Sequence, residues 1–529
     1  MTLTLAKRVA DVNTTSIAEA IHLGCHTMQS VFNEDDNSIP FFRSFVYPDA
    51  RLDFSPAHSE SHVPGRHLNA LLNAEDAVGA SVDEAAIEKH RRAALFSYSG
   101  PVALPLNRQA IGGPLVNFCP HNIREGLHAL YALVKYREDD EAMSLAERCI
   151  AAVFDLWCRQ LGWDEDSIRQ LGLNYAACQG FIHGEARLLG PLVKLYGATG
   201  YAPALELAMI FMEKATSEVY LEDGGYSVER FATVHTHSIT CVMSSLAQLA
   251  ELLGDARLLG RVKSFYDFGL WKMRDQLGWS PERALAENCD DGEMNNTGDI
   301  LETALILGRH GFTEYFEDAE RILRCHMLPA QLRDVSFIDD PPNPHGVNGS
   351  RDLASRHRGA FGFPAPYGHL PLGAGRHKLS FNMDVVGGTV GSLCEAYRDV
   401  TRHDATGHRI NLLFDHGTDN ITVSSPYTHD RLTVELKHQA PLSVRLPSWV
   451  DHGAVAIEGA SSEPVFSGGW LLFAHQPVGV PLHIDVPRVK RELLLPAELH
   501  VKPIRVLLQG DAVAAMESFE ADLTFFDPL

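Results

Sequence analysis

The chain has 529 residues, of which 45% are hydrophobic and 21% are charged, a globular composition with room for a large domain and an accessory one. The formal net charge of −23 argues against nucleic acid as a partner, because binding a polyanion favours a basic face, and equally against an anionic membrane surface. No N-terminal run has the apolar core of a signal peptide, and no later run reaches transmembrane length without charge, so we expect a cytoplasmic protein. The nine cysteines are scattered singly, which indicates neither a disulfide framework nor a zinc knuckle.

The N-terminal part of the chain is irregular except for two helical segments. Apolar residues recur at helical spacing over residues 16–32, and a second helix is predicted to begin at His67, because Val63-Pro-Gly breaks the pattern before it. His62 and Arg66 crowd around this helix start, where unpaired backbone N–H groups favour polar ligands. They either contribute to a site or cap a surface helix.

From about residue 116 a helical hairpin recurs along the chain. Each unit has two amphipathic segments separated by a short glycine-containing or charged break. The predicted pairs cover 122–135 and 141–157, 184–196 and 202–215, 237–253 and 257–271, and 297–307 and 315–328, and a further first helix covers 388–401. Repeated hairpins either stack into an open solenoid or close into a ring.

Two features favour the closed ring. Long irregular segments connect the hairpins at one end, over residues 158–182, 217–236, 272–296 and 329–387. Polar side chains also mark the starts of the first helices, namely His121, His183, Glu185, His235, His237, Asn295 and Asn296. A ring would bring both sets over one cavity. Residues 1–408 are therefore predicted to form an (α/α)6 toroid, with the first 115 residues supplying the remaining helices.

At about residue 409 the apolar period changes from helical to two. Alternating segments cover residues 431–437, 442–446, 454–458, 470–474 and 482–486, with turn residues between them. Short strands at this spacing are typical of an antiparallel sandwich. Residues 409–529 are therefore predicted to form a β-sandwich domain, which could pack on the toroid or form the contact of a homodimer.

The segment 277–299 is the first candidate for chemistry. It is rich in carboxyl and amide side chains between two helical segments, and it contains Trp279, Glu282, Glu287, Asp290, Asp291, Glu293, Asn295, Asn296 and Asp299. Sugar-binding clefts are often built from acidic and amide groups with an aromatic ring. A solvated loop in an acidic protein is the alternative interpretation.

Four stretches carry a resemblance to a known family. They are His183-Gly-Glu-Ala-Arg-Leu-Leu, His237-Ser-Ile-Thr, Asn296-Thr-Gly-Asp-Ile-Leu-Glu-Thr-Ala and Leu442-Ser-Val-Arg-Leu-Pro-Ser-Trp. In order and spacing the chain from about residue 120 onward resembles the superfamily of glycoside hydrolase family 127, the β-L-arabinofuranosidases. The resemblance implies a carbohydrate substrate and a glycosidase.

The metal chemistry of that family does not carry over. The resemblance implies a glutamate acid/base and a cysteine nucleophile held by zinc, with a Glu-x-Cys motif and a later Cys-Cys pair as ligands. Here Glu293-Met-Asn295 stands at the first motif and Asp384-Val385 at the pair, and the chain contains no Cys-Cys. The alternative register Glu287-Asn-Cys289 lacks the pair as well. Because a zinc thiolate needs such soft ligands, we predict no metal and no cofactor.

Two carboxyl groups remain for the cleavage of a glycosidic bond. Such a reaction needs an acid for the leaving oxygen and a carboxylate nucleophile or base across the sugar. Glu282 corresponds best to the acid/base of the family, and Asp384 could replace the lost cysteine. A surface loop carboxylate and a helix cap are the alternatives for these two residues, and retention or inversion stays open.

Further residues are candidates for binding the sugar. His183 and His237 match family positions that contact sugar hydroxyls, and His235 is a nearby alternative; an imidazole can both donate and accept. Trp279, Glu293, Asn295 and Asn296 join them from the acidic segment. The long loop at 341–369 adds Arg358, Tyr367 and His369, and its arginines would suit an acidic sugar. Core or capping histidines and a packed crossing loop are the alternatives.

The sequence thus predicts a metal-independent glycoside hydrolase that removes a terminal sugar from an oligosaccharide or glycoside. A polysaccharide lyase or sugar isomerase on the same toroid is a second hypothesis, since the histidine-rich rim permits proton abstraction. A non-catalytic carbohydrate-binding relative is a third, because the family nucleophile has been lost and fold does not fix function.

Overall fold

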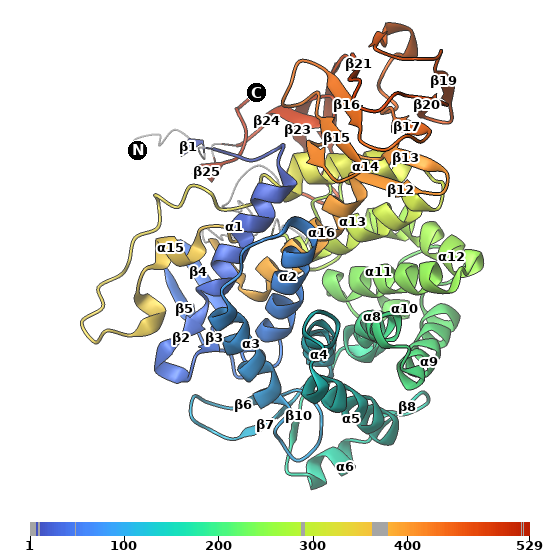
Figure 1. Ribbon diagram of the computed structural model, residues 1–529. Helices are drawn as coiled ribbons and strands as arrows, with labels where there is room; N and C mark the ends of the chain where they lie inside the picture. Colours follow the sequence, from blue (N-terminus) through green and yellow to red (C-terminus); the bar gives the residue numbers. More distant parts are fainter. Residues whose placement is uncertain are drawn as a thin grey trace.

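The computed structural model describes residues 7–8, 11–47, 49–286, 291–361, 379–519, 521 and 523–529. Within these residues, six helices form an inner ring (Figure 1): α2 (Val63–Val78), α4 (Ile123–Arg137), α8 (Leu189–Thr199), α11 (Thr236–Leu253), α13 (Met294–Arg309) and α16 (Asp384–Asp399). Each contacts the next, and α16 returns to α2. All of them line one polar cavity on the ring axis, through Arg66, His128, Lys194, Gln248, Glu302 and Ser392.

A second layer of helices surrounds this ring. It consists of α1 (Ile17–Gln29), α3 (Glu84–Ser97), α5 (Asp140–Leu156), α9 (Ala202–Glu218), α12 (Ala256–Asp267) and α14 (Glu314–Ile322). The last five each pack on the inner helix that precedes them in the chain, whereas α1 packs on α16. The first outer helix therefore completes the hairpin of the last inner helix. The predicted (α/α)6 toroid, with its missing helices supplied by the N-terminal residues, is confirmed.

The predicted hairpin breaks coincide with real helix caps. Gly200 and Gly254 end α8 and α11 with φ values of 70° and 66°, a left-handed conformation that glycine adopts without a Cβ penalty. Asp139 and Asp255 begin α5 and α12 by accepting backbone N–H groups of the first turn. Such N-caps stabilise a helix by about 1 kcal/mol each, so local sequence fixes where these helices start.

Helix α2 begins earlier than expected. The helix predicted from His67 starts at Val63, with Pro64 in its first turn. Proline is tolerated there because its missing N–H would be unpaired in any case. His62 consequently occupies the N-cap position, and Arg66 lies inside the first turn.

The C-terminal strands form two five-stranded sheets within the described part of the chain. One has the order β12 (Thr401–Asp404), β13 (Gly407–Ile410), β17 (Leu442–Arg445), β20 (Trp470–Phe473) and β19 (Val465–Ser467). The other has the order β14 (His416–Gly417), β15 (Ile421–Ser424), β16 (Leu432–Leu436), β21 (Leu482–Ile484) and β18 (Ile457–Glu458). Apolar residues of both sheets share one buried core, as in a sandwich. The pair β13–β17 is parallel, a departure from the all-antiparallel prediction.

The strand region packs directly on the helical toroid. Glu320 of α14 bonds to Arg445 of β17, and the Trp470 indole donates to Thr313 at 3.0 Å. Strand β12 follows α16 immediately, and the predicted boundary between residues 408 and 409 falls within β13. A three-stranded sheet of β22 (Lys490–Leu495), β23 (Ile504–Gln509) and β24 (Ala512–Met516) follows.

The remaining described elements are short. The strands are β1 (Lys7–Arg8), β2 (Phe32–Asn33), β3 (Ile39–Pro40), β4 (Arg43–Tyr47), β5 (Arg51–Asp53), β6 (Leu106–Arg108), β7 (Leu115–Phe118), β8 (Trp157–Cys158), β9 (Gly162–Trp163), β10 (Asn174–Tyr175), β11 (Leu379–Asn382) and β25 (Leu523–Thr524). The short helices include η2 (Pro120–Asn122), α6 (Glu165–Gln170), α7 (Gly180–His183), η3 (Glu185–Leu188), α10 (Val228–Phe231) and α15 (Leu353–His357). Among the described helices, none is both long and apolar enough to cross a lipid bilayer.

Candidate functional site

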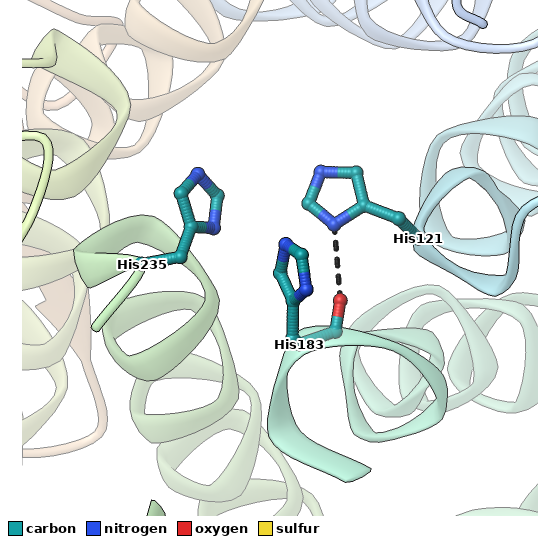
Figure 2. A group of neighbouring side chains, drawn as sticks. All are labelled: His121, His183 and His235. Atoms are coloured by element: carbon teal, nitrogen blue, oxygen red, sulfur yellow. Dashed lines mark hydrogen bonds between the residues drawn. The ribbon is translucent and has the colours of Figure 1, made fainter. Parts of the chain in front are cut away.

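Three histidines from three connecting segments face one another at one end of the ring (Figure 2). His121 lies in η2 before α4, His183 ends α7, and His235 is the N-cap of α11. Their ring centroids are 4.8 to 5.4 Å apart, and each ring is half-buried. The long connections therefore bring imidazole groups together, as expected for a closed ring.

Hydrogen bonds decide which nitrogen carries the proton in two of the three rings. His121 Nδ1 donates to the carbonyl oxygen of His183 at 3.0 Å, which leaves its Nε2 as an acceptor. His183 Nδ1 instead accepts the backbone N–H of Gln179 at 3.0 Å, so its Nε2 carries the proton. Burial, and then the charge of Arg187, lower the pKa of His183 to about 4 and those of His121 and His235 well below the usual range. Near pH 7 the cluster thus offers neutral donors and acceptors.

Asp384 supplies an ionised carboxylate beside this cluster. It is the first residue of α16, and its side chain is only 5% exposed. His62 Nε2 lies 3.2 Å and Arg66 Nε 3.4 Å from its Oδ2. Burial alone would raise the pKa of Asp384, but His62 and Arg66 outweigh burial and lower it to about 2.

Beneath these groups, Glu125 holds arginine side chains in place. Its Oε1 accepts from Arg66 at 2.9 Å, Arg187 at 2.8 Å and Arg124 at 3.0 Å. Glu125 and Arg187 are completely buried, so the ion pairs are shielded from water. This network ties α2, α4 and η3 together under the histidine cluster.

The acidic segment at residues 277–299 comes close to the histidine cluster. Its backbone pairs with itself in a short antiparallel ladder. Pro281 bridges Gly292, Glu282 N–H donates to the Asp291 carbonyl, and Glu293 N–H donates to that of Ser280. The amide of Asn296 donates to the Pro281 carbonyl at 2.9 Å and fixes this ladder on α13. Glu293, the N-cap of α13, lies 3.9 Å from His235 Nε2.

The surroundings of Glu293 raise the pKa of its carboxyl group. Burial, followed by the negative charges of Asp384 and Glu282, raises the pKa of Glu293 to about 8. Both predicted catalytic carboxyl groups therefore lie close enough to act on Glu293. Asn295 donates to Glu293 Oε1 at 2.7 Å, which keeps the glutamate side chain in position.

Groups of metal-ligand side chains also occur here. Within the described residues they are His121, His183 and His235; His235, His237 and Glu293; and His237, Cys241 and Asp299. His183 and His237 fit a metal poorly, however. The Nε2 of His183 is protonated, and both His237 nitrogens face arginine donors, at 3.0 Å for Arg66 and 3.4 Å for Arg187.

Three other residues that were predicted to bind the sugar are buried in the structure. His237 is buried between Arg66 and Arg187, and Asn296 supports the ladder from a fully buried position. Trp279 has no exposed surface and packs its ring on His500, with centroids 4.7 Å apart. Its ring is therefore part of the core packing and offers no exposed surface to a sugar.

The residues predicted from the long loop fall elsewhere. Arg358 is exposed, and its carbonyl oxygen accepts from Thr27 of the outer helix α1, so the structure does not bring it to the cluster. Tyr367 and His369 lie outside the described residues, as do Glu287 and Cys289 of the alternative metal register.

Sequence reasoning missed two groups that organise the site. The sequence places His121, Glu125 and His128 near one helix face, a possible metal triad for which a structural role is the preferred interpretation, and it does not single out Arg187. The signal for Arg187 was its place in the His183-Gly-Glu-Ala-Arg stretch, four residues after His183. Its partner Glu125 lies 62 residues away in sequence, which no local pattern reveals.

Comparisons with known proteins give a fold but no closer relative. No protein-family model and no curated protein matches the sequence. Among solved structures, a family 127 β-L-arabinofuranosidase from Geobacillus stearothermophilus T6 is similar, with a TM-score of 0.56 and 13% identity, over 94% of this chain and 80% of that one. A second structure, a β-arabinofuranosidase of the same family, gives 0.54 and 12%, over 87% and 77%. The predicted resemblance to this family is thereby confirmed at the level of the fold.

Proposed function

We propose that the protein is a glycoside hydrolase that removes a terminal sugar by a two-carboxyl mechanism without a metal. The observation that carries this proposal is the meeting of an ionised carboxylate, Asp384, with an acidic ladder beside neutral imidazoles. Glycosidic cleavage needs this combination of one carboxylate and one protonated acid. The fold shared with β-L-arabinofuranosidases is consistent with it.

Asp384 acts at the anomeric carbon. Because His62 and Arg66 keep it charged, it attacks that carbon directly or activates a water molecule. The glycosidic oxygen receives its proton from a carboxyl group of the ladder that carries Glu282 and Glu293. The family resemblance assigns this role to Glu282.

The histidine cluster binds the hydroxyl groups of the sugar. The Nε2 of His121 accepts a hydrogen bond from a sugar hydroxyl group, and the Nε2–H of His183 donates one to a hydroxyl oxygen. A sugar hydroxyl can satisfy both at once because it is donor and acceptor. Arg66 and Arg187 are engaged by Glu125, which favours a neutral sugar over an acidic one.

A sugar epimerase or isomerase is a second candidate. The observation in its favour is that the cluster holds neutral imidazoles, of which His121 has an unprotonated Nε2 that can take a proton from carbon next to a carbonyl. Such an enzyme exchanges a carbon-bound hydrogen with solvent deuterium without releasing an aglycone. A hydrolase releases the aglycone and leaves the carbon-bound hydrogens of the sugar unexchanged.

The experiment is a panel of 4-nitrophenyl glycosides that starts with the β-L-arabinofuranoside named for the structural neighbours. The wild-type protein is expected to release 4-nitrophenol from at least one glycoside. Asp384→Asn should lower kcat/KM at least about 10³-fold, and Glu282→Gln should also reduce it. Full turnover in both variants would contradict the proposal.

A further inference from the structure

Two free cysteines lie side by side where the chain enters the histidine cluster. Cys119 lies between β7 and η2, and Cys178 lies between β10 and α7. Their Sγ atoms are 3.9 Å apart, although 59 residues separate them in sequence. A disulfide bond is about 2 Å long, so the sulfurs need to approach by only about 2 Å to be joined.

Strand pairing holds the two thiols together. Strands β7 and β10 run parallel, with Phe118 opposite Tyr175. The N–H of Ala176 donates to the Phe118 carbonyl at 2.9 Å, which extends the pairing up to the residue before Cys119. The contact of Cys119 with Cys178 therefore follows from the backbone arrangement of the folded protein.

Solvent can reach this pair of thiols. Cys119 and Cys178 are half-buried, and among the other described cysteines Cys158 alone is exposed. The buried ones are Cys25, Cys149, Cys241, Cys325 and Cys394. A dissolved oxidant attacks an accessible thiol, and an adjacent second thiol converts the product into a disulfide bond. Cys119 and Cys178 meet both conditions.

Each cysteine is close in sequence to a hydrogen bond that orders the cluster. Gln179, directly after Cys178, donates its N–H to His183 Nδ1 at 3.0 Å. His121, two residues after Cys119, donates from Nδ1 to the His183 carbonyl at 3.0 Å. A movement that brings the two sulfurs together therefore displaces the groups that orient both imidazoles (Figure 2).

The backbone beside His183 also packs against one of the thiols. A Cβ added at Gly184 would lie 3.1 Å from Cβ and 3.2 Å from Sγ of Cys178, so the side chain of Cys178 lies against this backbone. A displaced Cys178 consequently changes the packing next to His183 as well as the Gln179 bond.

We propose that Cys119 and Cys178 form a redox modification site, at which a peroxide joins the two thiols in a disulfide bond and thereby disorganises the histidine cluster. Formation of the bond is independent of the proposed function. The loss of activity that follows from it rests on the proposed glycoside hydrolysis. A dithiol reductant reverses the modification.

The reaction takes two steps for hydrogen peroxide. One sulfur bonds to a peroxide oxygen, the O–O bond breaks, and a sulfenic acid and one water molecule form. The second sulfur then bonds to the sulfenic sulfur, the S–O bond breaks, and the hydroxyl group leaves with the thiol proton as a second water. The two thiols are oxidised to one disulfide, and the peroxide is reduced to two water molecules.

The first test needs no turnover. Wild-type protein is treated with hydrogen peroxide, its remaining thiols are blocked, and its peptides are analysed by mass spectrometry. We expect a linked pair of peptides that contains Cys119 and Cys178, lighter than the reduced pair by two hydrogen atoms and separated by dithiothreitol. Cys178→Ser should abolish the link, and Cys158→Ser, the matched control, should retain it. A peroxide dose that oxidises Cys158 without forming the link would overturn the proposal.

The second test measures kcat/KM on the glycoside that the panel identifies. Linked wild-type protein and linked Cys158→Ser are expected to lose at least about tenfold and to recover with dithiothreitol, because a displacement of about 1 Å lowers a rate by up to about 10²-fold. Cys178→Ser should keep its kcat/KM through the same treatment. Unchanged activity of the linked protein would contradict the effect on the cluster.

A failure of the proposed function is distinguishable from a failure of this proposal. If the reduced protein hydrolyses no glycoside, the proposed function fails, and histidine-selective ¹⁵N NMR tests the effect on the cluster instead. The Nδ1 signal of His183 should shift on peroxide treatment of the wild-type protein but not of Cys178→Ser. An unshifted signal in the linked protein would overturn the proposal.

Discussion

Asp384 is a buried carboxyl group and Glu293 a largely buried one, yet their neighbours move their pKa values in opposite directions. Asp384 contacts His62 and Arg66, whereas the negative charges of two other carboxyl groups act on Glu293. A buried acid with like-charged neighbours keeps its proton, and one with cationic neighbours loses it. The chemistry of this site therefore depends on residues that are distant in the chain.

The raised pKa of Glu293 predicts a change in alkaline stability. The folded state holds this proton up to pH about 8, whereas the unfolded chain releases it near the ordinary value of 4.5. Stability from this group is thus complete below about pH 4.5 and is lost as the pH rises towards 8. Glu293→Gln removes the loss, so its Tm relative to wild type should increase between pH 6 and pH 9.

The control for that measurement is Glu213→Gln, at an exposed pair with Arg159. Its Tm difference from wild type should be the same at both pH values. An unchanged difference in Glu293→Gln as well would refute the raised pKa.

Metal removal gives another prediction at this scale. The protonated Nε2 of His183 and the arginine contacts of His237 disfavour a bound cation. Dialysis against a chelator should therefore leave kcat/KM and Tm within experimental error of the untreated protein. Activity that is lost on chelation and restored by zinc would contradict the metal-independent mechanism.

At the scale of elements, Glu125 joins three parts of the inner ring. It belongs to α4, and it binds Arg66 of α2 and Arg187 of η3. Glu125→Gln removes the charge but keeps the shape, which leaves buried arginines without their counter-ion. Breaking a buried ion pair on one side costs about 3–5 kcal/mol. Urea denaturation should show a loss of this size.

Glu141→Gln serves as the comparison, because its pair with Arg91 is at the surface and Glu141 is 62% exposed. Its cost should stay below about 1 kcal/mol. Equal costs in the two variants would mean that the buried network does not stabilise the fold.

The helices could be predicted from sequence because their signals are local. Apolar spacing and the glycine and aspartate caps located most hairpins to within a few residues, although Pro64 misled the start of α2. No comparable local pattern in the sequence predicts where the side chains of the connecting segments point. Trp279 looked like a sugar platform but packs on His500, some 220 residues later in the chain. Arg66 and Arg187, which bind Glu125, and His235, which lies near Glu293, are likewise distant from these residues in sequence.

At the scale of the whole molecule, the outer layer of helices is completed by the contact of α1 with α16, the last helix of the inner ring. A Cβ added at Gly24 of α1 would lie 2.4 Å from a methyl group of Val390 in α16. Gly24→Ala should therefore destabilise the protein by about 1–3 kcal/mol through overpacking. Gly260→Ala in the outer helix α12 meets nothing within 4 Å and should stabilise by up to about 1 kcal/mol.

The opposite signs of these two alanine variants, read from thermal unfolding, test the closure. A stabilising Gly24→Ala would show that α1 does not pack tightly on α16. Because the site is formed where the inner helices begin, a loosened ring should also lower kcat.

The central claim is that water replaces the aglycone at the anomeric carbon with the help of Asp384. Its most direct test is mass spectrometry of the sugar released in ¹⁸O-labelled water from the glycoside that the panel identifies. The account predicts one ¹⁸O atom at the anomeric hydroxyl with the wild-type protein and at least about 10³-fold slower release with Asp384→Asn. An unsaturated product, a sugar without ¹⁸O, or full turnover by Asp384→Asn would contradict it.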